Sequence, residues 1–154
     1  MRNRLLVLTL ALFATTAFAK SYTPKKNTRA DIKAYVESAA KYVKKHGADC
    51  AVFKSKAWTF GDYYIFVDGP DNRTLCHPNA ALIGKSFDEI VDVNGKKVGV
   101  LIRDAAAKKG GGWTEYMWPR PGTDKPVPKS TFAMQVKGPD GKMYVVGSGG
   151  YELK

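Results

Sequence analysis

The last third of the chain consists of three strand-forming segments separated by short turns. The segments span residues 113–118, 130–136 and 143–148. A Pro-rich and Gly-containing connection over 119–127 joins the first two, and Gly138-Pro139-Asp140-Gly141 joins the last two. Strands joined by such short turns pair in antiparallel fashion. The sequence therefore predicts an antiparallel sheet that ends in a three-stranded meander.

A long helix is predicted near the start of the chain. Thr28 and Asp31 have the spacing of a capping box, and Gly47 follows a basic last turn over 44–46. The apolar residues between these limits recur at helical spacing and form one stripe. They are Ile32, Tyr35, Val36, Ala39 and Val43.

The middle of the chain adds a hairpin and a second helix. The hairpin pairs residues 62–68 with 73–77, and the helix spans 98–109. Residues 78–84 are predicted to form either a short helical turn or a lid. The fold class is α+β, with a long N-terminal helix packed on a central antiparallel sheet of about five strands.

The first residues have the composition of a secretory signal peptide. Arg2 and Arg4 are followed by a short apolar run over 5–13, and Ala17-Phe18-Ala19 is a small-x-small cleavage site before Lys20. The run is shorter than the roughly 20 residues of a membrane span. We therefore predict cleavage near Ala19/Lys20 and a periplasmic or secreted protein, with an uncleaved N-terminal anchor as the alternative.

The predicted organisation is a signal peptide over 1–19, a flexible N-terminus over 20–27 and one domain over 28–154. The chain has 25 Lys and Arg against 14 Asp and Glu, a net charge of +11. Export and the scatter of these residues in doublets argue against nucleic acid. The interpretation is a solvated surface, or a bias toward anionic ligands or an anionic membrane surface.

No catalytic residue, metal site or cofactor is predicted. Cys50 and Cys76 lack the spacing of a redox or zinc motif, so the alternatives are a disulfide or two buried free thiols. His46 and His77 are far apart, and no nucleophile–base pair is evident. Glycine-rich residues 147–150 lack the context of a phosphate loop and are interpreted as a turn or bulge.

The segment Gly112 to Pro119 combines three large aromatic residues in a strand pattern. Alternation places Tyr116 and Trp118 on one face of the strand and Trp113 on the other. Lys129 arrives from the next strand. An aromatic wall with a cation beside it predicts a pocket for a small anion, whereas Trp113 is expected in the core.

In order along the chain, these segments resemble the single Cache domain, type 2, a PAS-like extracellular sensor module of bacterial chemoreceptors and histidine kinases. The matching pieces cover roughly residues 28 to 152. They are Tyr64-Ile65-Phe66-Val67-Asp68, Leu75-Cys76-His77-Pro78, Leu82-Ile83-Gly84-Lys85, Asp92-Val93-Asn94-Gly95-Lys96, Gly111-Gly112-Trp113, Tyr116-Met117-Trp118-Pro119, Pro128-Lys129 and Gly147-Ser148-Gly149-Gly150-Tyr151.

The resemblance implies a cavity on the sheet that accepts small carboxylates of two to four carbons, such as acetate, pyruvate or lactate, without chemistry on the ligand. Departures from the family pattern at Cys76, Gln135 and Val136 leave the identity of the ligand open. The predicted ligand-binding residues are Lys129, Tyr116, Trp118, His77, Phe66, Tyr64 and Leu82.

Each of these residues has an expected role. Lys129 would neutralise the carboxylate, and Tyr116 and His77 would donate hydrogen bonds to it, His77 more strongly when protonated below about pH 6.5. Trp118, Leu82 and Phe66 would close the apolar end. The alternatives are a surface lysine, core aromatic residues and a capped or surface histidine. Whether the Tyr64 and Phe66 face lines the pocket or meets the helix stays open.

The predicted function is that of an exported, ligand-binding, sensor-type domain. With no output segment after residue 154, it is expected to act in signal transduction or chemotaxis through a membrane-bound sensor or receptor. The alternative is a periplasmic adaptor that docks on a membrane sensor without a small ligand. Homodimerisation through the N-terminal helix is a further option.

Overall fold

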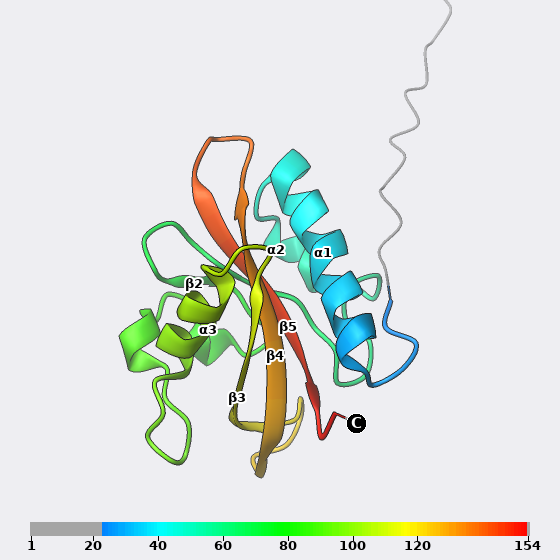
Figure 1. Cartoon of the computed structure of the whole chain (residues 1–154), viewed down its shortest axis with the longest axis vertical. Coiled ribbons are helices and arrows are strands. Elements are labelled where there is room, and N and C mark those ends of the chain that lie inside the picture. The colour runs from blue at the N-terminus through cyan, green and yellow to red at the C-terminus, as the bar shows by residue number, and fades with distance from the viewer. Residues whose placement is uncertain (1–22, 154) are drawn as a thin grey trace, which may run out of the picture.

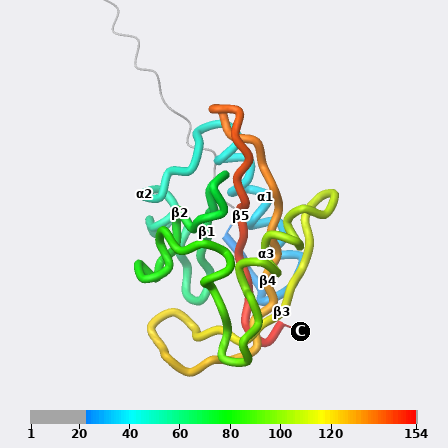
Figure 2. Tube along the Cα trace, turned by 90° about the vertical axis from the view of Figure 1, so that its left-hand side faces the viewer, coloured from blue at the N-terminus to red at the C-terminus, as the bar shows by residue number. Residues whose placement is uncertain are grey.

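A five-stranded antiparallel sheet organises the protein, as predicted. The computed structural model describes residues 23–153. Strand order is β2-β1-β5-β4-β3, so the first hairpin lies beside the last strand of the chain. Figure 2 shows β5 in the middle of this arrangement. The strands are β1 (Phe66–Asp68), β2 (Thr74–Cys76), β3 (Gly112–Pro119), β4 (Pro126–Lys137) and β5 (Met143–Tyr151).

Helix α1 (Arg29–His46) covers one face of the sheet (Figure 1). Its buried residues include the whole apolar stripe expected from the sequence. Thr28 Oγ1 accepts from Asp31 N at 3.2 Å, which is one half of the predicted capping box. Asp31 differs from the prediction, because its carboxylate accepts from the backbone N–H groups of Lys25 and Lys26, at 2.7 Å each. The helix ends at Gly47, whose φ is 82°.

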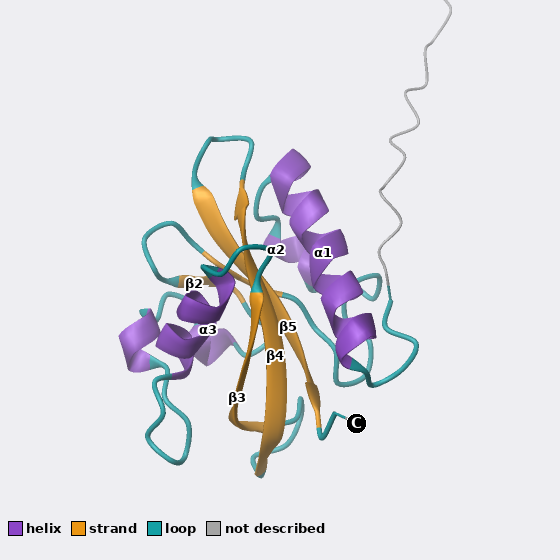
Figure 3. Ribbon diagram, in the orientation of Figure 1, coloured by secondary structure: helices purple, strands orange, loops and turns teal. Residues whose placement is uncertain are grey.

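The opposite face carries helix α3 (Val98–Ala106) and the 3-10 turn η2 (Phe87–Glu89). Figure 3 shows helices on both sides of the strands. Gly99 allows α3 to approach η2, because a Cβ there would meet the backbone of Phe87. The predicted helix over 98–109 is observed, but its last three residues lie outside it. A second 3-10 turn, η1 (Ala80–Leu82), occupies the segment predicted as a helical turn or lid.

Side chains alternate between the two faces of the sheet along β1 and the two residues before it, and this divides them between two cores. Ile65 and Val67 pack with α1, whereas Tyr64 and Phe66 pack with α3. The sequence left open whether Tyr64 and Phe66 line the pocket or meet the N-terminal helix, and the structure places them on the side away from α1. The hairpin strands are shorter than predicted, and their register shifts between Val67 and Asp68.

Cys50 and Cys76 form a disulfide across a separation of 26 residues, with their Cα atoms 5.1 Å apart. Cys50 begins the short helix α2 (Cys50–Phe53), and Cys76 ends β2. The bond therefore fastens the segment after α1 to the edge of the sheet.

Residues 147–150 are part of β5, so their interpretation as a turn or bulge was wrong. The glycines serve close packing instead. A Cβ at Gly147 would collide with the ring of Phe66, and one at Gly149 would lie 2.7 Å from Lys129 Cε. Glycine thus leaves room on this strand for two large side chains.

The predicted signal peptide over 1–19 and its cleavage site lie outside the described residues. Within 23–153, no helix has the length and apolar character needed to cross a membrane.

Candidate functional site

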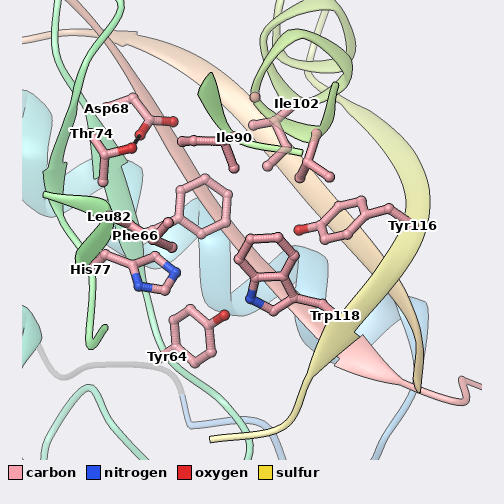
Figure 4. Close-up of a pocket in the computed structure, with 12 residues that line it drawn as sticks. Tyr64, Phe66, Asp68, Thr74, His77, Leu82, Ile90, Ile102, Tyr116 and Trp118 are labelled. Carbon is pink, nitrogen blue, oxygen red and sulfur yellow. Dashed lines mark hydrogen bonds between the residues drawn. The ribbon is translucent and has the colours of Figure 1, made fainter. Parts of the chain in front are cut away.

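A narrow cavity lies between the α3 side of the sheet and the helical elements that cover it (Figure 4). The cavity volume is about 30 Å³. The lining is mainly apolar. The residues are Tyr64, Phe66, Asp68, Thr74, His77, Leu82, Ile90, Val98, Gly99, Ile102, Tyr116 and Trp118.

The structure brings most of the predicted site residues together around this cavity. They come from β1 and its approach, from the end of β2, from η1 and from β3. Their role toward a ligand stays a prediction. The predicted residues that line the cavity are Tyr64, Phe66, His77, Leu82, Tyr116 and Trp118.

Lys129 is buried, so the alternative of a solvent-facing lysine does not hold. It lies on β4 directly opposite Tyr116 of β3 and Tyr151 of β5, so the three side chains share the α3 face. Its side chain is 2% exposed and does not itself line the cavity. Its Nζ donates to Tyr64 Oη at 2.6 Å, and Tyr64 forms the cavity wall.

Aromatic rings surround the ammonium of Lys129. Its Nζ lies 4.3 Å from the ring centroid of Tyr64 and 5.0 Å from that of Tyr151. Within the described residues, Lys129 has no carboxylate at ion-pair distance. Burial lowers the pKa of Lys129 to about 7, against a smaller opposing effect of Asp62. Desolvation without a counter-ion disfavours the charged form.

His77 is buried beside Tyr64 and Phe66, with ring centroids 5.1 and 6.4 Å away. Its Nδ1 accepts from the backbone N–H of Asn79 at 2.9 Å, so Nε2 carries the ring proton. Burial, and then the nearby Lys129, lower the pKa of His77 to about 3. The expected protonation below about pH 6.5 was therefore wrong, and His77 is a neutral donor.

Tyr116 and Trp118 share the cavity face, as alternation predicted, with their rings edge to face at a centroid distance of 5.7 Å. The Tyr116 hydroxyl is already hydrogen-bonded to Thr131 Oγ1 at 2.8 Å. Trp113 packs on the α1 side against Phe132, as expected for a core residue.

Asp68 is a site residue that sequence reasoning missed. It is 4% exposed, lines the cavity, and accepts from Thr74 Oγ1 at 2.9 Å. Burial raises the pKa of Asp68 to about 7, only partly offset by the bond from Thr74. The signal was available, because Tyr64, Phe66 and Asp68 alternate on one strand face.

A second, more open pocket adjoins the cavity beneath the loop from Pro119 to Asp124. Tyr64, His77 and Trp118 line both spaces. These three side chains therefore form the partition between the inner cavity and the outer pocket. Arg120 of the outer pocket pairs with Asp62 and Glu152.

The family model of the single Cache domain 2 matches residues 7–152 of the chain. The chain is also similar to the sensor histidine kinase MctS of Rhizobium johnstonii, with 33% identity over 91 residues. That match covers 58% of this chain and 19% of the kinase, so the chain spans about a fifth of that relative's length.

Solved structures with the same fold include sensor domains. A periplasmic sensor domain of a chemotaxis protein has 32% identity and a TM-score of 0.60, covering 80% of this chain and 94% of that one. A methyl-accepting chemotaxis protein from Vibrio parahaemolyticus has 23% identity and a TM-score of 0.58, with coverage of 79% and 86%. A Cache chemosensory domain described for carboxylic acid recognition has 20% identity and a TM-score of 0.50, with coverage of 78% and 86%.

Proposed function

The chain belongs to the single Cache domain 2 family, and from its cavity we propose that it is a sensor-type domain that binds a small carboxylate of two to four carbons. Its role is ligand binding rather than catalysis. The acid lies in the cavity with its carboxylate toward Tyr64 and Lys129 and its apolar part against Phe66, Leu82 and Trp118.

The buried, unpaired ammonium of Lys129 is the observation that carries this proposal. A buried cation without a counter-ion is unfavourable, and an anion at hydrogen-bond distance relieves that cost. The Tyr64 hydroxyl now accepts the hydrogen bond from Lys129. A ligand carboxylate that replaces or joins this hydroxyl gains a charge-assisted bond in a desolvated site. His77 Nε2 and the indole N–H of Trp118 are further donors at the partition.

Relatives support the sensory role in coarser terms. The similar periplasmic domain belongs to a chemotaxis protein, and the similar kinase is a sensor. The fold also accommodates acids, because one domain that shares it is described for carboxylic acid recognition. We infer that this domain is exported to the periplasm or secreted, and that a membrane-bound sensor or receptor reads its ligand state.

A thermal shift experiment with the purified protein tests the proposal. Acetate, pyruvate, lactate and butanoate are added at increasing concentration, and the melting temperature is followed. A ligand that binds only the folded state stabilises it by about 2.7 kcal/mol at a hundredfold excess over Kd. We expect a rise of several degrees with at least one acid, and none with matched concentrations of chloride.

The matched variants are Lys129→Met and Lys137→Met, which remove a buried and an exposed lysine from the same strand. The shift should disappear in the first and persist in the second. If no acid shifts the protein, or if Lys129→Met keeps the full shift, the carboxylate proposal fails. An adaptor role without a small ligand then becomes the better account.

A further inference from the structure

The end of the cavity away from Lys129 carries a buried acid. Asp68 ends β1, lines the cavity and accepts one hydrogen bond from the neutral hydroxyl of Thr74 at 2.9 Å. Within residues 23–153 it forms no ion pair. Burial raises its pKa to about 7, as expected of a carboxylate without a nearby cation. A ligand whose far end is apolar would gain nothing from the Asp68 carboxyl group.

The two polar ends lie at opposite ends of one strand face. Figure 4 shows the Asp68–Thr74 pair and Tyr64 on opposite sides of the Phe66 ring. An extended chain rises about 3.3 Å per residue, so four residues separate the Tyr64 and Asp68 backbones by about 13 Å. Most of the other side chains that line the cavity are apolar. They include Phe66, Ile90, Val98 and Ile102.

The cavity is thus bipolar, with a cation behind Tyr64 and a carboxyl group at Asp68. These charges are complementary to a zwitterion whose carboxylate and ammonium are separated by methylene groups. An extended four-carbon amino acid with a terminal amino group places its nitrogen about 5 Å from the carboxyl carbon. A hydrogen bond of about 3 Å at each end extends this span to about 11 Å. The narrow space between the ends suits an unbranched chain.

We propose that the ligand is a short ω-amino acid of four or five carbons, whose amino group binds Asp68 beside Thr74 while its carboxylate binds at Tyr64 and Lys129. This inference rests on the proposed function and specifies its ligand class. An ammonium pairs with the Asp68 carboxylate and supplies donors that a plain acid lacks. An α-amino acid places both charges at one end and cannot reach both sites.

Three four-carbon acids measured by calorimetry at pH 7 test the proposal. Butanoate lacks the amino group, 2-aminobutanoate carries it beside the carboxylate, and 4-aminobutanoate carries it at the far end. We expect 4-aminobutanoate to bind the unaltered protein at least about tenfold more tightly than either of the others. Tenfold corresponds to about 1.4 kcal/mol, just below the roughly 1.5–3 kcal/mol of a hydrogen bond to a charged group.

The variant Asp68→Asn should remove the advantage of 4-aminobutanoate over butanoate. Asp71→Asn, which alters an exposed carboxylate three residues away, should retain it. Equal or weaker binding of 4-aminobutanoate by the unaltered protein overturns the inference, whatever the variant's ability to fold. Retention of the advantage in a folded Asp68→Asn protein overturns it as well. If none of the acids binds, the proposed function itself fails, whereas butanoate binding without an amino preference overturns this inference only.

Discussion

The ammonium of Lys129 donates to the hydroxyl of Tyr64 at 2.6 Å, inside a shell of aromatic rings rather than beside a carboxylate. Tyr64 is part of the cavity wall, so this single bond connects the buried charge to the space where a ligand would lie. The hydroxyl occupies the acceptor position that a ligand carboxylate would take. In the proposed binding mode, a ligand carboxylate replaces or joins this hydroxyl as the acceptor.

Binding of butanoate should weaken as the pH rises from 6 to 9. Lys129 loses its proton near pH 7, and the neutral amine no longer pairs with a carboxylate. Asp68 also ionises near pH 7 and adds a negative charge to the cavity, whereas His77, with a pKa of about 3, does not titrate in this range. Calorimetry should show a loss of up to about tenfold per pH unit.

Two variants separate these effects on the affinity for butanoate. Asp68→Asn should keep a decline caused by Lys129, and Lys129→Met should bind weakly at every pH. Binding that stays constant from pH 6 to 9 in the unaltered protein would contradict the role of Lys129.

Asp68→Asn should change how stability depends on pH. The folded-state pKa of Asp68 is about 7 instead of the ordinary 3.8. Between these values the folded protein keeps a proton that the unfolded chain has lost, so the free energy of unfolding falls as the pH rises. The loss amounts to at most about 4 kcal/mol. Urea unfolding at pH 5 and pH 8 should show the variant relatively more stable at pH 8. An identical difference at both pH values would disprove the raised pKa.

Loss of the Cys50–Cys76 disulfide should destabilise the protein by about 3–4 kcal/mol. The bond closes a loop across 26 residues, and the chain-entropy model gives this magnitude for such a loop. The double variant with serine at both positions, compared with the oxidised protein in urea unfolding, measures the effect. Dithiothreitol should lower the melting temperature of the unaltered protein and leave that of the variant unchanged. A reductant effect of equal size on both would assign it to something other than this bond.

Gly147→Ala should impair ligand binding as well as stability. An added methyl group meets the ring of Phe66, and that ring lines the cavity. To relieve this collision, the Phe66 ring moves into the cavity. Overpacking of this kind costs about 1–3 kcal/mol of stability. Calorimetry should show at least a tenfold loss of affinity for the bound acid.

Adding Phe66→Leu should restore part of this binding, because the shorter side chain removes the collision. Ser148→Ala alters the neighbouring residue, whose register partner Phe132 packs on the α1 side, and should leave binding unchanged. Equal effects of Gly147→Ala and Ser148→Ala would show that the close approach to Phe66 does not matter for the cavity.

Local patterns were sufficient to predict α1 and the alternation along β3. The apolar stripe from Ile32 to Val43 and the basic turn before Gly47 predicted α1 to within a residue or two. Alternation placed Trp113 and the pair Tyr116 and Trp118 on opposite faces of β3. Glycines 147–150 were misjudged, because their role lies in contacts with residues far away in sequence.

The sequence by itself determined the α+β class and the antiparallel meander, because periodicity and short turns act over a few residues. Together with the family resemblance it also named half of the side chains that line the cavity. Only the tertiary structure decided the electrostatics of the site. Tertiary packing desolvates Lys129, His77 and Asp68, and desolvation changes the pKa of each by an amount that no local pattern encodes. The predicted anion pocket thereby became a cavity with a cation at one end and an acid at the other.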